Sequence, residues 1–106
     1  MKIPPFEWGM AMTKWVLFSR VGRAGLSIGM VVICSAQSVF YSDINGEINF
    51  IERGRVVGFF PTCEQAINAQ DAARQATALA NERGEPSLLA VKSAIRNSPG
   101  YMSAIR

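Results

Sequence analysis

The segment from Trp15 to Tyr41 constrains this chain most, because a mostly apolar stretch can cross a membrane, direct export or fill a core. Its central part, Ala24 to Phe40, carries no charged side chain. A membrane-spanning helix needs about 20 predominantly apolar residues. The uncharged part is shorter than that, and extending it back to Trp15 brings in Arg20 and Arg23.

The charges around this segment favour a membrane location. Lys14, Arg20 and Arg23 precede the uncharged part, whereas the first charge after it is Asp43. Basic residues flanking a transmembrane helix stay on the cytoplasmic side. This order of basic residues before the apolar segment and an acidic residue after it predicts an anchor in a bacterial-type inner membrane, with a cytoplasmic N-terminus and a C-terminal part in the periplasm. Gly25 and Gly29 form a GxxxG pair, which lets membrane helices pack closely.

Two other interpretations of the segment stay open. The small residues around Gln37, in Ala36-Gln37-Ser38, match a signal-peptidase site, which would leave a mature chain starting near Val39. Alternatively, the β-branched run from Met30 to Cys34 is a strand in the core of a soluble cytoplasmic protein. Met10 and Met12 also leave open that translation starts there.

The composition argues against catalysis. The chain contains no histidine, and histidine is the commonest general base and metal ligand in proteins. The net charge of +3 is too small to indicate a nucleic-acid partner. We therefore predict a protein that is not an enzyme, without catalytic residues, cofactor or metal. Cys34 and Cys63 are candidates for a disulfide if both reach an oxidising compartment.

The second half of the chain predicts a small antiparallel sheet. Asn45-Gly46 tolerates the positive φ angles of a type I′ turn, so it joins Val39–Ile44 to Glu47–Ile51 as a hairpin. A second break at Arg53-Gly54 leads to an apolar run, Val56–Phe60. The pattern predicts a three-stranded antiparallel meander.

A helix follows the sheet. Thr62 is a good N-cap, with Gln65 three residues later, and Gly84 is a good C-terminal stop after Arg83. Ile67 points away from the apolar arc of this helix, which is made almost entirely of alanine. The predicted apolar arc of this first helix contains Ala66, Ala69, Ala72, Ala73, Ala76, Leu79 and Ala80. Residues 87–96 predict a second, shorter helix.

Together these features predict an α+β fold. Residues 1–14 form an irregular arm, residues 15–38 form the apolar segment, expected to be helical, and residues 39–106 form the α+β domain.

For function, the sequence predicts a small membrane-tethered or exported protein that binds another protein, or a second copy of itself, through its meander and helix. The alternative is a soluble cytoplasmic binding or inhibitory module of the kind that mobile elements encode. Aromatic residues alternate along the strands, so some of them face away from the core and mark a partner surface. The predicted partner surface comprises Phe50, Phe59, Phe60, Arg53, Arg55 and Ile67.

Overall fold

The apolar segment that was predicted to be helical folds as a β-hairpin. In the computed structural model, which describes residues 14–22 and 24–104, β1 (Trp15–Ser19) pairs with β2 (Leu26–Cys34). The prediction of a helix was wrong, and β-branched and aromatic residues, which pack well on a pleated surface, make up three of the five residues of β1 and four of the nine residues of β2. Within the described residues, no helix combines the length and the apolar character needed to cross a bilayer.

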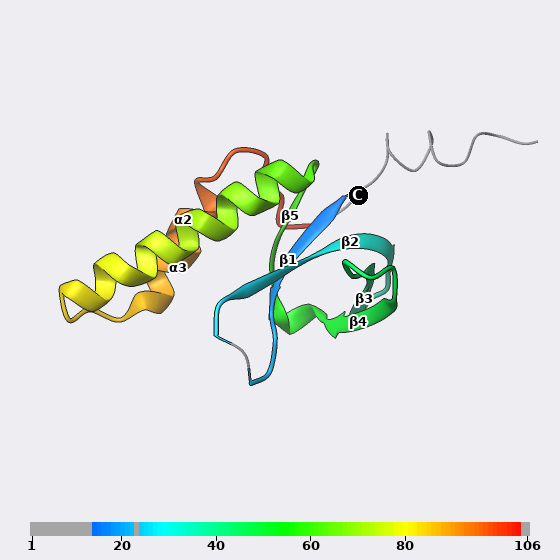
Figure 1. Cartoon of the computed structure of the whole chain (residues 1–106), viewed down its shortest axis with the longest axis horizontal. Coiled ribbons are helices and arrows are strands. Elements are labelled where there is room, and N and C mark those ends of the chain that lie inside the picture. The colour runs from blue at the N-terminus through cyan, green and yellow to red at the C-terminus, as the bar shows by residue number, and fades with distance from the viewer. Residues whose placement is uncertain (1–13, 23, 105–106) are drawn as a thin grey trace, which may run out of the picture.

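The α+β prediction is confirmed, with more strands than expected. Three further strands follow along the chain, and two helices complete the fold (Figure 1). Most of the predicted arm, residues 1–13, lies outside the described residues. The remaining elements are β3 (Ser38–Ser42), β4 (Ile48–Glu52), the 3-10 turn η1 (Arg53–Arg55), β5 (Val56–Phe60), α2 (Cys63–Glu82) and α3 (Ser87–Arg96).

The sheet is antiparallel, with the strand order β4-β3-β2-β1-β5. The predicted strand at Val56–Phe60 is therefore present, but it pairs with β1 and not with β4. The meander prediction was wrong at this point because Arg53–Arg55 form a 3-10 turn, which does not fold the chain back into a hairpin.

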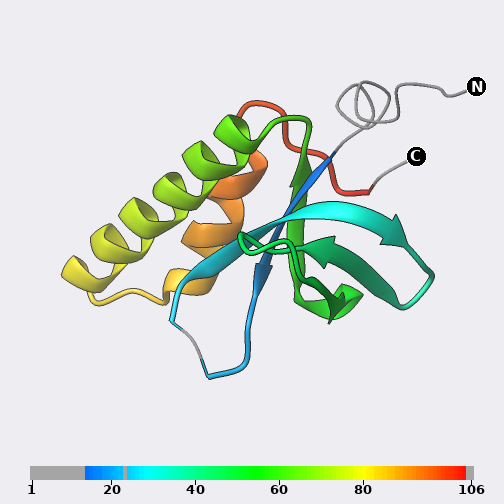
Figure 2. The same ribbon diagram turned by 45° about the vertical axis from the view of Figure 1, so that its right-hand side comes forward.

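The short connection between the two outer strands forces the sheet to curl. In a flat sheet, β4 and β5 would lie about 19 Å apart, at about 4.8 Å for each strand spacing. The chain from Glu52 to Val56 spans at most about 14 Å, and a 3-10 turn shortens it further. The edges of the sheet must therefore approach each other, and Figure 2 shows the long β2 arcing between them.

The concave face of the curled sheet encloses its own core. Phe18 and Tyr41 are buried at its centre, with ring centroids 4.7 Å apart. The register skips Val57 in β5 and Val32 in β2, and such bulges increase the local bend of a strand. This inner core consists of Val16, Phe18, Val39, Tyr41 and Phe59, with Val31, Cys34, Ile51, Val56 and Met102 packed against it.

The helices form a second core on the outer face of the sheet. In Figure 1, α2 and α3 lie side by side next to β1 and β5, and β3 and β4 lie on the far side of the sheet. The alanine face of α2 allows the helix to approach the sheet closely. This outer core contains Leu17, Phe60, Ala66, Ala69, Ala73 and Ile95.

The predicted helix ends are confirmed. The Thr62 hydroxyl accepts a hydrogen bond from the Gln65 N–H at 3.1 Å, which satisfies one of the free donors at the start of α2. Gly84 follows the helix with a φ of 68°, a conformation that glycine adopts without strain. Leu79 differs from the prediction, because it is exposed rather than on the buried arc.

The predicted hairpin between β3 and β4 is also confirmed, but its turn is not of type I′, because Asn45 does not have a positive φ. Gly46 has a φ of 83°, and β3 pairs with β4 on either side of the turn. The Asp43 carboxylate accepts hydrogen bonds from the N–H groups of Asn45 and Glu47, at 2.8 and 3.0 Å. Asp43 thus stabilises the turn that sets the register of β4.

Candidate partner-binding surface

The outer face of the sheet carries exposed apolar side chains where β2, β3 and β4 extend beyond the helices. Ile33, Phe40 and Phe50 lie opposite one another across these three strands. Ile33 is 60% exposed and Phe50 is 61% exposed. Because Val39 and Tyr41 point into the inner core, Phe40 between them must point outward. We define the outer apolar face as Met30, Ile33, Phe40, Ile48 and Phe50.

Contacts within this face hold its aromatic side chains in place. The ring centroids of Phe40 and Phe50 lie 5.8 Å apart, within the range of favourable aromatic pairs. Met30 and Ile48 occupy the next row, on either side of Ser42. The face is thus a continuous set of side chains from three neighbouring strands.

A groove continues the outer apolar face toward the start of α2. It encloses about 440 Å³ between the helix and the sheet. Ile67, which the sequence placed off the alanine arc, is exposed and lines this groove. Its apolar walls are formed by Trp15, Ile28, Met30, Ile44, Cys63 and Ile67.

The free edge of β4 adds backbone groups to this surface. Asp43 N–H donates to the Glu47 carbonyl, and Arg53 N–H donates to the Gln37 carbonyl, at 2.9 and 3.0 Å. Hydrogen-bonded pairs recur at every second residue of an antiparallel ladder, so Asn49 and Ile51 are the residues of β4 that bond to β3. The N–H and C=O groups of Ile48 and Phe50 and the N–H of Glu52 therefore point away from the sheet, whereas the Glu52 C=O, at the N-cap of η1, accepts the first hydrogen bond of that turn. No strand of the described residues pairs with this edge.

Two of the six predicted surface residues belong to the cores instead. Phe59 is 1% exposed and packs in the inner core, whereas Phe60 is 0% exposed and packs in the outer core. Both faces of β5 are covered, one by the curled sheet and the other by the helices. The prediction for Phe59 and Phe60 is corrected for this reason. Phe50 and Ile67 are on the surface, as predicted.

The two predicted arginines lie in η1, at one end of β4. The Arg53 Nε donates to the Ser35 carbonyl at 2.7 Å, so this side chain ties η1 to the turn between β2 and β3. Arg53 and Arg55 are both partly buried. Neither lies within the row of Ile33, Phe40 and Phe50.

The predicted roles of the glycine pair and the cysteine pair are also corrected. Gly25 lies in the turn before β2 with a φ of 81°, and Gly29 lies within β2, so they do not form a helix-packing motif. Cys34 and Cys63 are free thiols. Cys34 packs against the inner core, whereas Cys63 begins α2 and lines the groove on the outer face.

Sequence reasoning missed most of the outer apolar face. Met30, Ile33 and Phe40 lay in the stretch that was interpreted as an anchor, a signal or a buried strand. Val39 and Tyr41 point to one face of the strand and Phe40 to the other, and this was a usable signal. A strand with apolar side chains on both faces needs another element packed against each face. The position of the helices decides which face of the strand stays exposed, and only the tertiary structure gives that position.

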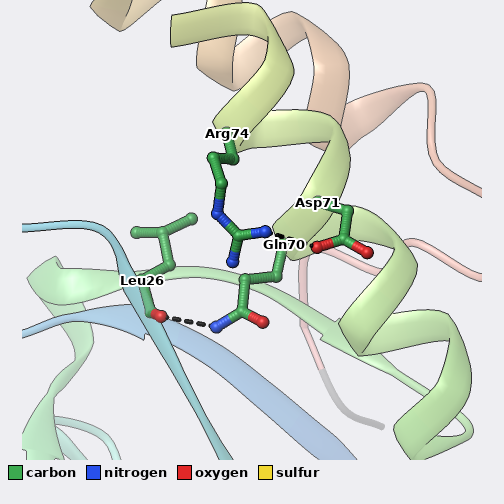
Figure 3. Close-up of polar contacts among 4 residues, drawn as sticks. All are labelled: Leu26, Gln70, Asp71 and Arg74. Carbon is green, nitrogen blue, oxygen red and sulfur yellow. Dashed lines mark hydrogen bonds and ion pairs between the residues drawn. The ribbon is translucent and has the colours of Figure 1, made fainter. Parts of the chain in front are cut away.

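A second groove lies between α2, α3 and the start of β2, and encloses about 750 Å³. Figure 3 shows the polar side chains on its wall. The Gln70 Nε2 donates to the Leu26 carbonyl at 2.7 Å, and the Arg74 guanidinium forms an ion pair with Asp71 at 2.8 Å. These polar groups already have partners within the chain, so the groove is a weaker candidate for a ligand site.

Within residues 14–22 and 24–104, no group of three or more acidic or cysteine side chains is arranged to hold a metal ion. The outer apolar face, the groove beside Ile67 and the edge of β4 are therefore the features that distinguish this surface. Comparison of the chain with family models, with curated proteins and with solved structures found no match.

Proposed function

We propose that this chain is a binding protein that contacts another protein through the outer apolar face and the groove beside Ile67. The observation that carries the proposal is the row of Ile33, Phe40 and Phe50 on a part of the sheet that the helices leave uncovered. Large contiguous apolar patches are uncommon on the surface of soluble monomers and are often binding sites.

The energetics support such a role. Transfer of apolar surface out of water contributes about 25 cal/mol for each Å² that is buried. Aromatic side chains bury the largest areas, and at interfaces a few such anchors contribute most of the binding free energy. Phe40 and Phe50 are suited to be these anchors because their mutual contact already restricts both rings.

The proposal keeps residues 15–38 within the folded domain. Cleavage near Val39 would remove β1 and β2, and with them Val16, Leu17 and Phe18, which are all buried. This favours the interpretation of Met30–Cys34 as a strand over that of a cleaved signal. The membrane or periplasmic location and its cytoplasmic alternative both stay predictions, as does the absence of catalysis that the lack of histidine favours.

Site-specific photo-crosslinking in the source cells tests this proposal. A benzophenone amino acid at Ile33 is expected to form a discrete adduct with a second protein, because Ile33 is exposed at the centre of the binding surface. The matched control carries the same group at Gln75, an exposed position on α2. The adduct at Ile33 should disappear when Phe40 is changed to Asp.

Equal labelling from Ile33 and Gln75 would contradict the proposal, since it would indicate random collisions. Absence of any adduct at Ile33 would also contradict it. An adduct that contains two copies of this chain and nothing else would point to self-association in place of a different partner.

A further inference from the structure

We propose that two copies of this chain associate through β4, which pairs in antiparallel orientation with β4 of the second copy. The inference rests on the proposed function, because it names the partner that binds the β4 part of the surface. Three observations carry it: the direction of the backbone groups of β4, the occupied edge of β5, and the charges at the two ends of β4.

The backbone of β4 is ready to accept another strand. Ile48 and Phe50 direct their N–H and C=O groups outward, as the register with β3 requires, and Glu52 directs its N–H outward while its C=O begins η1. The side chains of Ile48 and Phe50 are on the outer face, where both are more than half exposed. An edge with free backbone groups and exposed apolar side chains is a template for strand pairing.

The opposite edge of the sheet is already occupied. Phe59 and Met102 exchange two backbone hydrogen bonds, each 2.9 Å long, so Met102 covers the edge of β5 at Phe59. A head-to-tail assembly, in which β4 of one copy pairs with β5 of the next, would have to displace Met102. Pairing of β4 with β4 uses the same surface on both copies and closes into a dimer with two-fold symmetry.

The backbone directions restrict the register of the pairing. A residue with outward groups must lie opposite another such residue, so Ile48, Phe50 and Glu52 pair only among themselves. Placing Phe50 opposite Phe50 of the second copy uses all three residues, with Ile48 opposite Glu52 at both ends. A shift by two residues in either direction leaves one of the three unpaired within the strand.

The side chains agree with this register. On the outer face, the row of Ile33, Phe40 and Phe50 continues across the two-fold axis into the same row of the second copy. Just beyond the ends of β4, Glu47 of one copy comes near Arg53 of the other, whose guanidinium also donates to the Ser35 carbonyl, and symmetry repeats the pair. Oppositely charged residues at facing positions stabilise a strand pair, whereas like charges destabilise it.

Cysteine crosslinking of the full chain tests this register. Facing residues of a hydrogen-bonded antiparallel pair have Cα atoms about 5.5 Å apart, within the range that a disulfide bridges. Phe50→Cys is expected to form an intermolecular disulfide about tenfold or more faster than Ile44→Cys, the matched control. Ile44 is 98% exposed and lies outside β4, in the turn. The parent chain, with its native Cys34 and Cys63, sets the background rate.

Measurement of mass in solution provides a second, independent test. The parent chain is expected to show twice its 11.6 kDa mass by light scattering at high concentration. Phe50→Pro is expected to shift it to the monomer while the circular dichroism is unchanged, because the N–H that proline removes points outward. A parent chain that stays monomeric over a wide range of concentrations would overturn the proposal.

Equal disulfide rates for Phe50→Cys and Ile44→Cys would also overturn it. The failure of this proposal is distinguishable from failure of the proposed function. If the Ile33 crosslink to another protein persists in a chain that is always monomeric, the dimer is refuted and the binding function stands. If the dimer forms but Ile33 crosslinks to no other protein, the proposed binding of another protein is refuted and the dimer stands.

Discussion

Phe60→Ala is expected to lower the free energy of unfolding by about 3–5 kcal/mol, whereas Phe50→Ala, which loses the contact with Phe40, lowers it by about 1 kcal/mol or less. Both substitutions remove the same atoms from neighbouring strands in the sequence. Phe60 is fully buried between the sheet and the helices, and its ring lies 6.2 Å from that of Tyr101. Phe50 projects from β4 with most of its surface exposed. Urea denaturation followed by circular dichroism measures both changes.

The comparison has to be made in dilute solution, because dimerisation would add concentration-dependent stability to the parent chain. Similar losses for the two variants would contradict the assignment of Phe60 to the outer core and Phe50 to the surface. If Phe60→Ala does not fold at all, Phe60→Leu provides a smaller perturbation of the same site. It is expected to destabilise less than Phe60→Ala and more than Phe50→Leu.

Gly29→Ala is the second substitution with a large expected effect. A Cβ atom at Gly29 would lie 2.8 Å from Cγ of Tyr41, and the ring has no room to retreat because Phe18 packs next to it. Overpacking of a core typically costs about 1–3 kcal/mol. We expect a loss of this size in urea denaturation, with the m-value unchanged.

Gly54→Ala is the matched control for this prediction. Gly54 lies in η1, where an added Cβ meets no atom within 4 Å and φ is not positive. The control should change the free energy of unfolding by less than about 0.5 kcal/mol. An equal loss in both variants would contradict the assignment of the Gly29 effect to contact with Tyr41.

The sequence predicted those elements whose signals are local. Thr62 and Gly84 mark the ends of α2 through hydrogen bonds and backbone angles that involve only nearby residues. Asn45-Gly46 determined the β3–β4 hairpin in the same way. Such signals depend on a few consecutive residues, and the surrounding fold did not override them.

The elements that depend on distant partners were not predicted. The segment from Trp15 to Cys34 is apolar on both sides because β1 and part of β2 lie between the inner core and the helices. A strand covered on both faces loses the alternation that identifies it, and a continuous apolar run is also typical of a membrane helix. The pairing of β5 with β1 was missed because the two strands are separated by four other elements.

The candidate site shows the same limitation. Phe40, Phe50, Phe59 and Phe60 are indistinguishable by residue type, yet two are exposed and two are buried. Their difference arises from the curl of the sheet, which covers one face of β5, and from α2 and α3, which cover the other. The prediction that some aromatic side chains face outward was correct. Deciding which of them are exposed required the position of the helices.

β4 is a paired strand with a free outer edge, and amide hydrogen exchange measured by NMR tests this most directly. In dilute solution, the amides of Asn49 and Ile51 are expected to be protected by their bonds to β3. Those of Ile48, Phe50 and Glu52 should exchange nearly as fast as in an unfolded chain. Equal protection of all five amides at every dilution would contradict the claim, because it would mean that another part of the chain covers this edge.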